Sequence, residues 1–158
     1  MNQKVVLILG SKSDQDQADK ICTVLDEFGV PYQVRIASAH RTPKKVMKIL
    51  SDLENSKNQT VVIVVAGLSN ALSGMISGIS AFPVVTCPVY DFLDINSSLR
   101  MPSGVAHGTV LKPANAAIFV LKILALSNPK LENKIKNYLQ KRQQKIEQDD
   151  AKIQRKSS

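Results

Sequence analysis

The sequence predicts an α/β fold in which a parallel β-sheet is covered by helices on both faces. Short apolar runs alternate with amphipathic stretches of helical length from residue 4 to about residue 127. The connections between them are short, and glycine or proline stands at several boundaries. Alternating strands and helices of this kind build parallel sheets, because each helix carries the chain back to begin another strand in the same direction.

The first strand and helix show the pattern most plainly. Residues 4–9 are rich in Leu and β-branched side chains and end at Gly10, which is typical of a buried strand. Residues 14–28 place apolar side chains three and four positions apart, which predicts a helix with one buried face. Gly29 and Pro31 follow, and these residue types commonly punctuate the end of a helix.

The alternation then continues to residue 126. Further apolar runs predict three more strands and a last short extended piece, at residues 32–37, 60–66, 83–87 and 104–111. Between and after them, apolar periodicity, a run rich in small residues and a proline suited to a first helical turn predict helices at residues 43–53, 70–79 and 113–126.

Residues 130–158 differ in kind from the rest of the chain. They are polar, carry few large apolar side chains and contain no glycine or proline, which predicts one long C-terminal helix. We expect this helix to pack on a neighbouring subunit. The chain is therefore expected to form a single α/β domain over residues 1–128, with residues 129–158 as a helical extension of the same domain.

The composition describes a globular protein. Of the 158 residues, 44% are hydrophobic and 22% charged, which excludes disordered, collagen-like and coiled-coil classes for most of the length. Cys22 and Cys87 show no pairing pattern, so a reducing cytoplasm is the expected location. The apolar runs at 5–9 and 61–68 are too short for a signal segment or a membrane span, so no membrane partner is expected.

The predicted site lies where the parallel strands end. Ligands of open α/β sheets bind at the carboxyl ends of the strands, where loops and helix N-termini converge. Four loops bring hydroxyls, two arginines and a histidine to that edge, at residues 10–14, 38–43, 67–70 and 97–104.

The loop at residues 10–14 is a candidate phosphate loop. Its small residues allow a close backbone approach to an anion, and the following helix offers free N–H groups. It matches neither a Walker A loop nor a dinucleotide fingerprint. A purely local interpretation, in which Ser13 or Asp14 caps the helix, stays equally open.

The loop at residues 38–43 is the strongest candidate for chemistry. Arg41 could hold a phosphate through its fork of N–H donors, and His40 belongs to the residue type that exchanges protons near neutral pH. His107 is as well explained by a structural or peripheral role. No metal site is indicated, Cys22 and Cys87 read as buried small hydrophobes, and no Gly-x-Ser-x-Gly elbow is present.

Four motifs, taken in order and spacing, resemble the aminoimidazole ribonucleotide carboxylase and mutase family of purine biosynthesis, over about residues 4–127. They are Gly-Ser-Lys-Ser-Asp at 10–14, Ser-Ala-His-Arg-Thr-Pro at 38–43, Ala-Gly at 66–67 and Met-Pro-Ser-Gly-Val at 101–105. The resemblance implies a three-layer flavodoxin-like fold and a homo-octamer. It also implies 5-aminoimidazole ribonucleotide and carbon dioxide as small-molecule substrates, without ATP, biotin, metal or other cofactor.

Within that family the chain is more similar to class II, the carboxylases that use carbon dioxide directly. Class I mutases, which move a carboxyl group from the exocyclic nitrogen to C4, carry Ala-Gly-Gly-Ala-Ala-His in the third loop, whereas residues 66–70 read Ala-Gly-Leu-Ser-Asn. Residues 97–104, Ser-Ser-Leu-Arg-Met-Pro-Ser-Gly, are also similar to class II, whereas class I typically has Gln before the Met-Pro. Two residues depart from the class II pattern: Arg41 stands where Lys is usual, and Leu68 replaces Arg.

The resemblance also implies roles for single residues. His40 would be the acid/base that removes the C4 proton. Ser11, Ser38 and Arg41 would bind the phosphate, Asp14 the ribose hydroxyls, and Gly67 with Ser69 the base and carboxylate region. Further candidates at the same edge are Ser13, Asn70, Arg100 and Met101.

Three alternatives remain. The first is the class I mutase, and the second is a flavodoxin-like nucleotide-binding or signalling module, whose receiver form would need an acidic pair after the first strand. The third is nucleic-acid binding, suggested by the net charge of +8. Residues 130–158 hold nine basic and four acidic side chains, so +5 of that charge lies in the tail, and aromatic residues are only 4% of the chain. We therefore expect no nucleic-acid partner.

Overall fold

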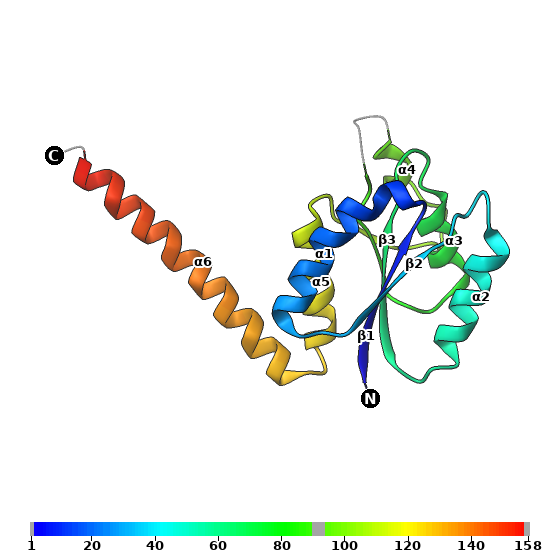
Figure 1. Cartoon of the computed structure of the whole chain (residues 1–158), viewed down its shortest axis with the longest axis horizontal. Helices are drawn as coiled ribbons and strands as arrows, with labels where there is room; N and C mark the ends of the chain where they lie inside the picture. Colours follow the sequence, from blue (N-terminus) through cyan, green and yellow to red (C-terminus); the bar gives the residue numbers. More distant parts are fainter. Residues whose placement is uncertain (1, 90–93, 157–158) are drawn as a thin grey trace.

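The structure, a computed structural model, describes residues 2–89 and 94–156 (Figure 1). Its strands are β1 Gln3–Leu9, β2 Tyr32–Ile36, β3 Gln59–Val65, β4 Val84–Thr86 and β5 Gly108–Thr109. Its helices are α1 Gln15–Phe28, α2 Pro43–Glu54, α3 Ala71–Ile79, α4 Asn96–Leu99, α5 Pro113–Ala125 and α6 Pro129–Lys156, with a short 3₁₀ turn at Lys12–Asp14.

The five strands form one sheet in the order β2-β1-β3-β4-β5, and every neighbouring pair is parallel. The side chains of β1 alternate between the two faces because successive residues of a strand point in opposite directions. Val5, Leu7 and Leu9 belong to the core with α1, α5 and the start of α6. Val6 and Ile8 belong to the core with α2 and α3. The predicted three-layer α/β fold is confirmed.

The register of the central strands places their carboxyl ends level with one another. Leu9 of β1 pairs with Ile36 of β2 and with Val65 of β3. The chain leaves all three strands at the same edge of the sheet, so the loops that begin at Gly10, Ala37 and Ala66 start side by side. This arrangement is the structural basis of the site described below.

Some predicted boundaries differ from those of the structure. The helix expected at 14–28 is preceded by the turn Lys12–Asp14 and begins at Gln15, and the extended piece expected at 104–111 pairs only at Gly108–Thr109. That pairing is short because β4, its only neighbour on the described sheet, is itself three residues long. The short helix α4 was not predicted. Residues 1, 90–93 and 157–158, which fall within the predicted domain and tail, lie outside the described residues.

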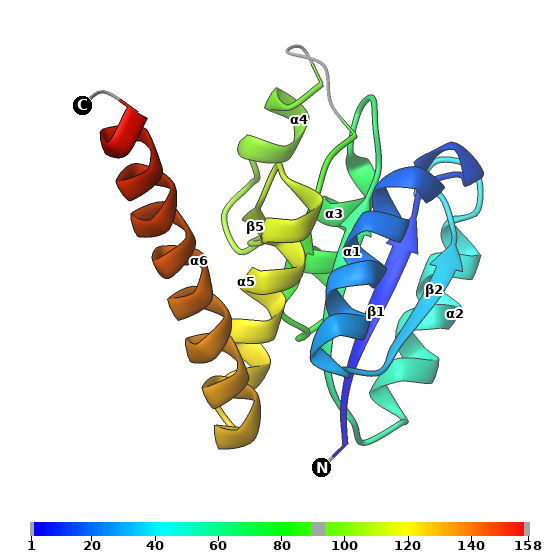
Figure 2. The same ribbon diagram turned by 60° about the vertical axis from the view of Figure 1, so that its left-hand side comes forward.

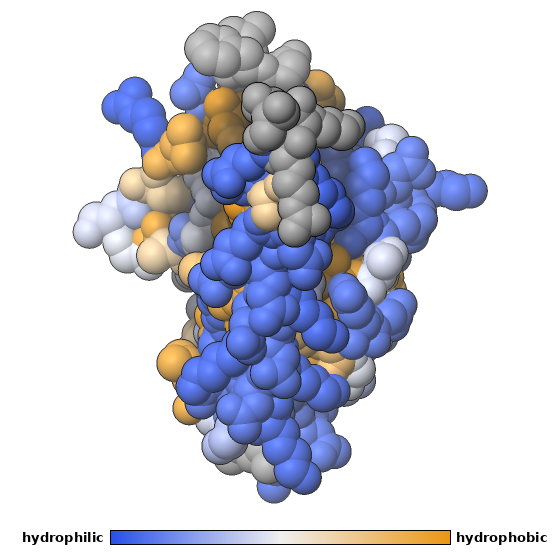
Figure 3. Space-filling model, turned by 90° about the vertical axis from the view of Figure 1, so that its left-hand side faces the viewer, coloured by the Kyte–Doolittle hydropathy of each residue, from blue (hydrophilic) through white to orange (hydrophobic). Residues whose placement is uncertain are grey.

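Helix α6 starts beside α5 and then runs away from the sheet, as Figures 1 and 2 show. Leu131 and Ile135 are buried in the core, and the ring of Tyr138 packs edge-on against Phe28 with 5.4 Å between centroids. The remaining length is mostly hydrophilic, and Figure 3 shows it crossing that side of the molecule beside patches of hydrophobic surface. No helix among the described residues is long and apolar enough to cross a membrane.

A polar network closes the amino-terminal edge of the sheet. Gln3 Nε2 donates to Gln59 Oε1 at 2.9 Å and to the Leu124 carbonyl at 2.6 Å. Asn128 Nδ2 donates to Gln3 Oε1 at 2.8 Å, while Asn128 Oδ1 accepts the N–H of Leu131 in the first turn of α6. The network fixes the α5–α6 connection to the base of the sheet and so sets where α6 begins.

Candidate active site

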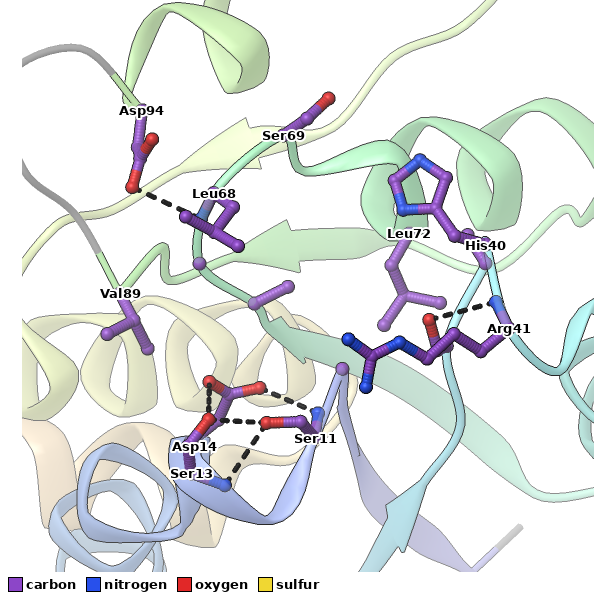
Figure 4. Close-up of a pocket in the computed structure, with 15 residues that line it drawn as sticks. Ser11, Ser13, Asp14, His40, Arg41, Leu68, Ser69, Leu72, Val89 and Asp94 are labelled. Carbon is purple, nitrogen blue, oxygen red and sulfur yellow. Dashed lines mark hydrogen bonds between the residues drawn. The ribbon is translucent and has the colours of Figure 1, made fainter.

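A cavity of about 720 Å³ opens at the carboxyl edge of the sheet (Figure 4). It brings together eight of the predicted site residues: Ser11, Ser13, Asp14, Ser38, His40, Arg41, Gly67 and Ser69. The rest of its lining is mainly apolar or small: Gly10, Ala39, Ala66, Leu68, Leu72, Val89 and Asp94. Three predicted candidates, Asn70, Arg100 and Met101, do not line it.

The first wall is a capped turn ahead of α1. The N–H of Ser13 donates to Ser11 Oγ at 3.1 Å, and the N–H of Ser11 donates to Asp14 Oδ2 at 2.8 Å, which together form a capping box. The hydroxyls of Ser11 and Ser13 also bond to each other. Ser11 therefore caps the 3₁₀ turn, whereas Asp14 stands at the N-cap position of α1 without a side-chain capping bond, so the predicted capping of the helix by the side chain of Ser13 or Asp14 is wrong. The Asp14 carboxylate, 6% exposed, is held in a fixed position at the cavity.

The second wall is the loop between β2 and α2. Backbone bonds shape it: the N–H of Arg41 donates to Ser38 Oγ at 3.2 Å, and the N–H of Ser38 donates to Thr42 Oγ1 at 2.9 Å. The side chains of His40 and Arg41 are exposed, and neither makes a hydrogen bond or ion pair with any of residues 2–89 or 94–156. Figure 4 shows the guanidinium of Arg41 extending toward Ser11 and Asp14, and the imidazole of His40 above Leu72.

The third wall is the loop after β3. A Cβ at Gly67 would lie 3.0 Å from the carbonyl oxygen of Val89, so the close approach of these two backbones requires glycine. Leu68 adopts a left-handed backbone conformation with φ 54° and is 76% exposed. The exposed hydroxyl of Ser69 follows it. Gly67 and Ser69 thus both line the cavity, in the loop that lies across from Ser11 and Asp14 (Figure 4).

Of the three candidates outside the cavity, Asn70 and Met101 have structural contacts. Asn70 is 2% exposed, caps α3 by accepting the N–H of Ser73, and donates to Thr86 Oγ1 at 2.7 Å and Ser98 Oγ at 3.0 Å. Met101 packs on α3, where its sulfur lies 3.1 Å from the position of a Cβ on Gly74. Arg100 is exposed. Asn70 therefore supports the third loop from behind.

The remaining histidine and the cysteines have no place in the cavity lining. His107 Nε2 lies 3.0 Å from the carbonyl of Ser98, which ties the segment before β5 to α4. Both cysteines are buried, and burial raises the pKa of the Cys87 thiol to about 11. Such a thiol stays protonated and unreactive at neutral pH. Residues 2–89 and 94–156 contain no cluster of three metal-ligating side chains.

Two features of the site escaped sequence reasoning. Asp94 lines the cavity, and its carboxylate accepts the N–H of Leu68 at 3.2 Å across 26 positions of sequence. Leu72 and Val89 supply apolar lining on either side of the third loop. No local pattern marks these residues, because their positions depend on how α3, β4 and the segment before α4 pack together.

The arrangement suits one small anionic ligand with a flat polar ring. Arg41 provides a fixed positive charge, the hydroxyl of Ser38 provides a further donor, and Asp14 provides an acceptor for hydroxyls. His40 provides a group able to take or give a proton. The apolar lining gives a planar ring a surface to lie against.

Comparison with known proteins shows to which family the chain belongs. The family model described as AIR carboxylase matches residues 4–145. The chain belongs to the AIR carboxylase family. It is 38% identical to the phosphoribosylaminoimidazole carboxylase of Treponema denticola, over 98% of this chain and all of that protein. It is 39% identical to the N5-carboxyaminoimidazole ribonucleotide mutase of Methanocaldococcus jannaschii, over 94% of this chain and 96% of that one.

The fold of AIR carboxylases agrees with the structure throughout. The crystal structure of Treponema denticola PurE superimposes with a TM-score of 0.93 and 38% sequence identity, covering 95% of this chain and 98% of the other. The family resemblance expected from the four motifs is confirmed, and the match includes α6 in its length. The relatives carry both carboxylase and mutase names, so the reaction of this member has to be argued from its own site.

Proposed function

We propose that this chain is a phosphoribosylaminoimidazole carboxylase, which joins carbon dioxide to C4 of 5-aminoimidazole ribonucleotide in the synthesis of inosine monophosphate. One observation carries the proposal. A single cavity holds an exposed imidazole, an exposed guanidinium and a helix-start turn bearing a fixed carboxylate. Those groups complement the base, the phosphate and the ribose of one ribonucleotide.

The phosphate and ribose are assigned to the first and second walls. The guanidinium of Arg41 forms charge-assisted hydrogen bonds with the phosphate, together with the hydroxyls of Ser11 and Ser38. The fixed Asp14 carboxylate accepts hydrogen bonds from the ribose hydroxyls. Ser13 lies in the same turn and adds a donor. Gly67 and Ser69 contact the base and the new carboxylate.

The chemistry proceeds in two steps. The electron-rich aminoimidazole ring attacks carbon dioxide through C4, so a C4–carbon bond forms and one C=O electron pair moves onto oxygen. C4 then carries both hydrogen and carboxylate. His40 takes the C4 proton, and the electrons of the C4–H bond restore the aromatic ring. Fixing both reactants in one cavity supplies the remaining rate enhancement.

The mutase is the second candidate, and a specific observation favours it: the Methanocaldococcus jannaschii protein named a mutase is 39% identical to this chain. The carboxylase is preferred because the third loop, residues 66–70, contains no histidine and presents Leu68 at the cavity. The mutase reaction moves the carboxyl group from the exocyclic nitrogen to C4 and the C4 proton in the opposite direction, so the same cavity and the same His40 could serve either reaction.

A paired assay separates the two reactions. Purified protein is given either 5-aminoimidazole ribonucleotide with bicarbonate or the N5-carboxylated isomer, in both cases without ATP. We expect the first substrate to be converted to 4-carboxy-5-aminoimidazole ribonucleotide. Rapid consumption of the N5-carboxylated isomer alone would identify a mutase, and inactivity toward both would overturn the proposed function.

We also propose that the protein works in the cytoplasm as a homo-octamer. The two buried free cysteines suit a reducing compartment. Helix α6 supports assembly, because Leu139, Ile146 and Ile153 recur every seven residues and are 40%, 72% and 66% exposed. Sedimentation analysis should give the mass of eight chains, and Ile146→Lys should shift it toward smaller species if α6 lies in an interface.

A further inference from the structure

The third wall of the cavity is held by a hydrogen-bonded clamp. We give this name to residues 94–98, which comprise a two-residue turn and the start of α4. The clamp contacts the loop at residues 67–70 through the N–H of Leu68, which donates to Asp94 Oδ2 at 3.2 Å, and the N–H of Asn70, which donates to Ser97 Oγ at 2.9 Å. Ser97 Oγ also lies 3.3 Å from the carbonyl oxygen of Leu68.

The backbone conformation of Leu68 is the feature that such a clamp would hold in place. Its φ of 54° lies in the left-handed region, which a residue with a Cβ and a branched side chain adopts only when its surroundings hold it there. Burial supplies no restraint, since the side chain is 76% exposed. The restraint therefore comes from the backbone contacts of Leu68, and among the described residues Asp94 provides the acceptor for its N–H.

The conformation of Leu68 determines where its neighbours point. Gly67 is held by a parallel β-bridge to Val89, and the N–H of Val89 donates to the carbonyl of Ala66 at 3.1 Å. Asn70 is fixed on the other side by its buried bonds to Thr86 and Ser98. Leu68 and Ser69 are thus the adjustable part of the loop, and rotation at Leu68 would move Ser69 relative to the cavity.

We propose that Asp94 is a positioning residue, which holds Leu68 in its left-handed conformation and thereby keeps Gly67 and Ser69 placed against the substrate. The proposal rests on the proposed function, since it assigns Gly67 and Ser69 to the base and carboxylate region. Asp94 acts through the backbone of the loop rather than on the reacting atoms. Because its carboxylate also lines the cavity, a direct contact with the ligand is the competing explanation that the test must separate.

A double-mutant cycle distinguishes positioning of the loop by Asp94 from a direct contact between Asp94 and the ligand. Asp94→Ala removes the acceptor, and we expect kcat/KM for 5-aminoimidazole ribonucleotide to fall about tenfold, with the melting temperature close to that of the wild type. Asp94→Asn keeps an acceptor oxygen and should recover most of the loss. In the Leu68→Gly background the loop reaches the left-handed conformation without help, so Asp94→Ala should cost less than about twofold there.

The matched control is Asp52→Ala, which removes an exposed carboxylate of α2 whose ion-pair partner is Lys48 and which lies outside the cavity. Its kinetics should equal those of the wild type. An unchanged kcat/KM in Asp94→Ala would overturn the proposal. An equal loss in the Leu68→Gly background would also overturn it, because it would show direct contact with the ligand.

A structural measurement keeps this inference distinct from the proposed function. Hydrogen–deuterium exchange of the intact protein reports on the amides of residues 67–70 whether or not the protein carboxylates anything. Asp94→Ala should speed exchange in that segment, and Asp94→Asn should not. If the wild type proves inactive while this pattern holds, the clamp stands and the assigned reaction fails; unchanged exchange in Asp94→Ala overturns the clamp itself.

Discussion

The two edges of the sheet offer cavities of nearly equal size but opposite character. The carboxyl edge holds about 720 Å³, and the groove at the amino edge, lined by Gln3, Gln59 and Asn128 among others, holds about 690 Å³. At the amino edge the polar side chains bond to one another and to the carbonyl of Leu124. At the carboxyl edge His40 and Arg41 make no side-chain hydrogen bond to the described residues.

The difference shows that volume alone does not mark a site. Polar groups whose hydrogen bonds are already made stabilise the fold and have little left to offer a ligand. Exposed groups that converge on one cavity keep their bonding capacity for the substrate. The carboxyl edge contains both kinds of polar group. The turn containing Ser11 and Asp14 is preorganised by its own hydrogen bonds, whereas the side chains of His40 and Arg41 remain available to bind a ligand.

His40→Asn should give the largest loss of activity. It tests whether the imidazole of His40, which makes no hydrogen bond to the described residues, takes the C4 proton. Asparagine cannot take up a proton at neutral pH, so we expect turnover to fall by about a thousandfold, within the range for loss of a general base. Binding of 5-aminoimidazole ribonucleotide, measured by calorimetry, should remain within about threefold of the wild type. Near-normal turnover would sink the assignment of His40.

Arg41→Ala should come next, because it removes the only Lys or Arg among the described residues that line the cavity. A lost charge-assisted contact to phosphate is worth about 1.5–3 kcal/mol, so KM should rise roughly ten- to a hundredfold, with a smaller change in kcat. Arg41→Lys should recover part of the affinity, since it keeps the charge but loses the planar fork. Unchanged KM in Arg41→Ala would place the phosphate elsewhere.

Gln3→Ala should affect stability alone and so tests the amino edge. It leaves the carbonyl of Leu124 and the amide of Asn128 short of a partner, which should lower the free energy of unfolding by about 1–3 kcal/mol. Denaturant unfolding measures that loss. Activity per folded molecule should stay within about twofold of the wild type, and a larger drop would mean that the amino edge contributes to function.

The sequence was sufficient to predict the sheet and two walls of the site. Periodicity located the strands that end near Gly10 and Ala37, and parallel connections placed the loops after them at one edge. The same reasoning made the extended piece at 104–111 too long, because the pairing length of β5 is set by β4 and not by its own residues. It also missed the short helix α4.

The third wall could be predicted only in part. Gly67 and Ser69 were found from their place after a strand, but the left-handed backbone of Leu68 and its bond to Asp94 join segments 26 positions apart. Asn70 was taken as a candidate for the site, and the structure gives it instead a buried bonding pattern behind the loop. Contacts of this range depend on tertiary packing and leave no local pattern in the sequence.

The central claim is that the carboxyl edge, and not the amino edge, takes the ribonucleotide. Hydrogen–deuterium exchange of the intact protein, with and without saturating 5-aminoimidazole ribonucleotide, tests it most directly. The account predicts slower exchange with ligand in residues 10–15, 38–43 and 67–70, and unchanged exchange in residues 29–31, 59–60 and 127–131. Protection of the amino-edge segments without protection at the carboxyl edge would contradict it.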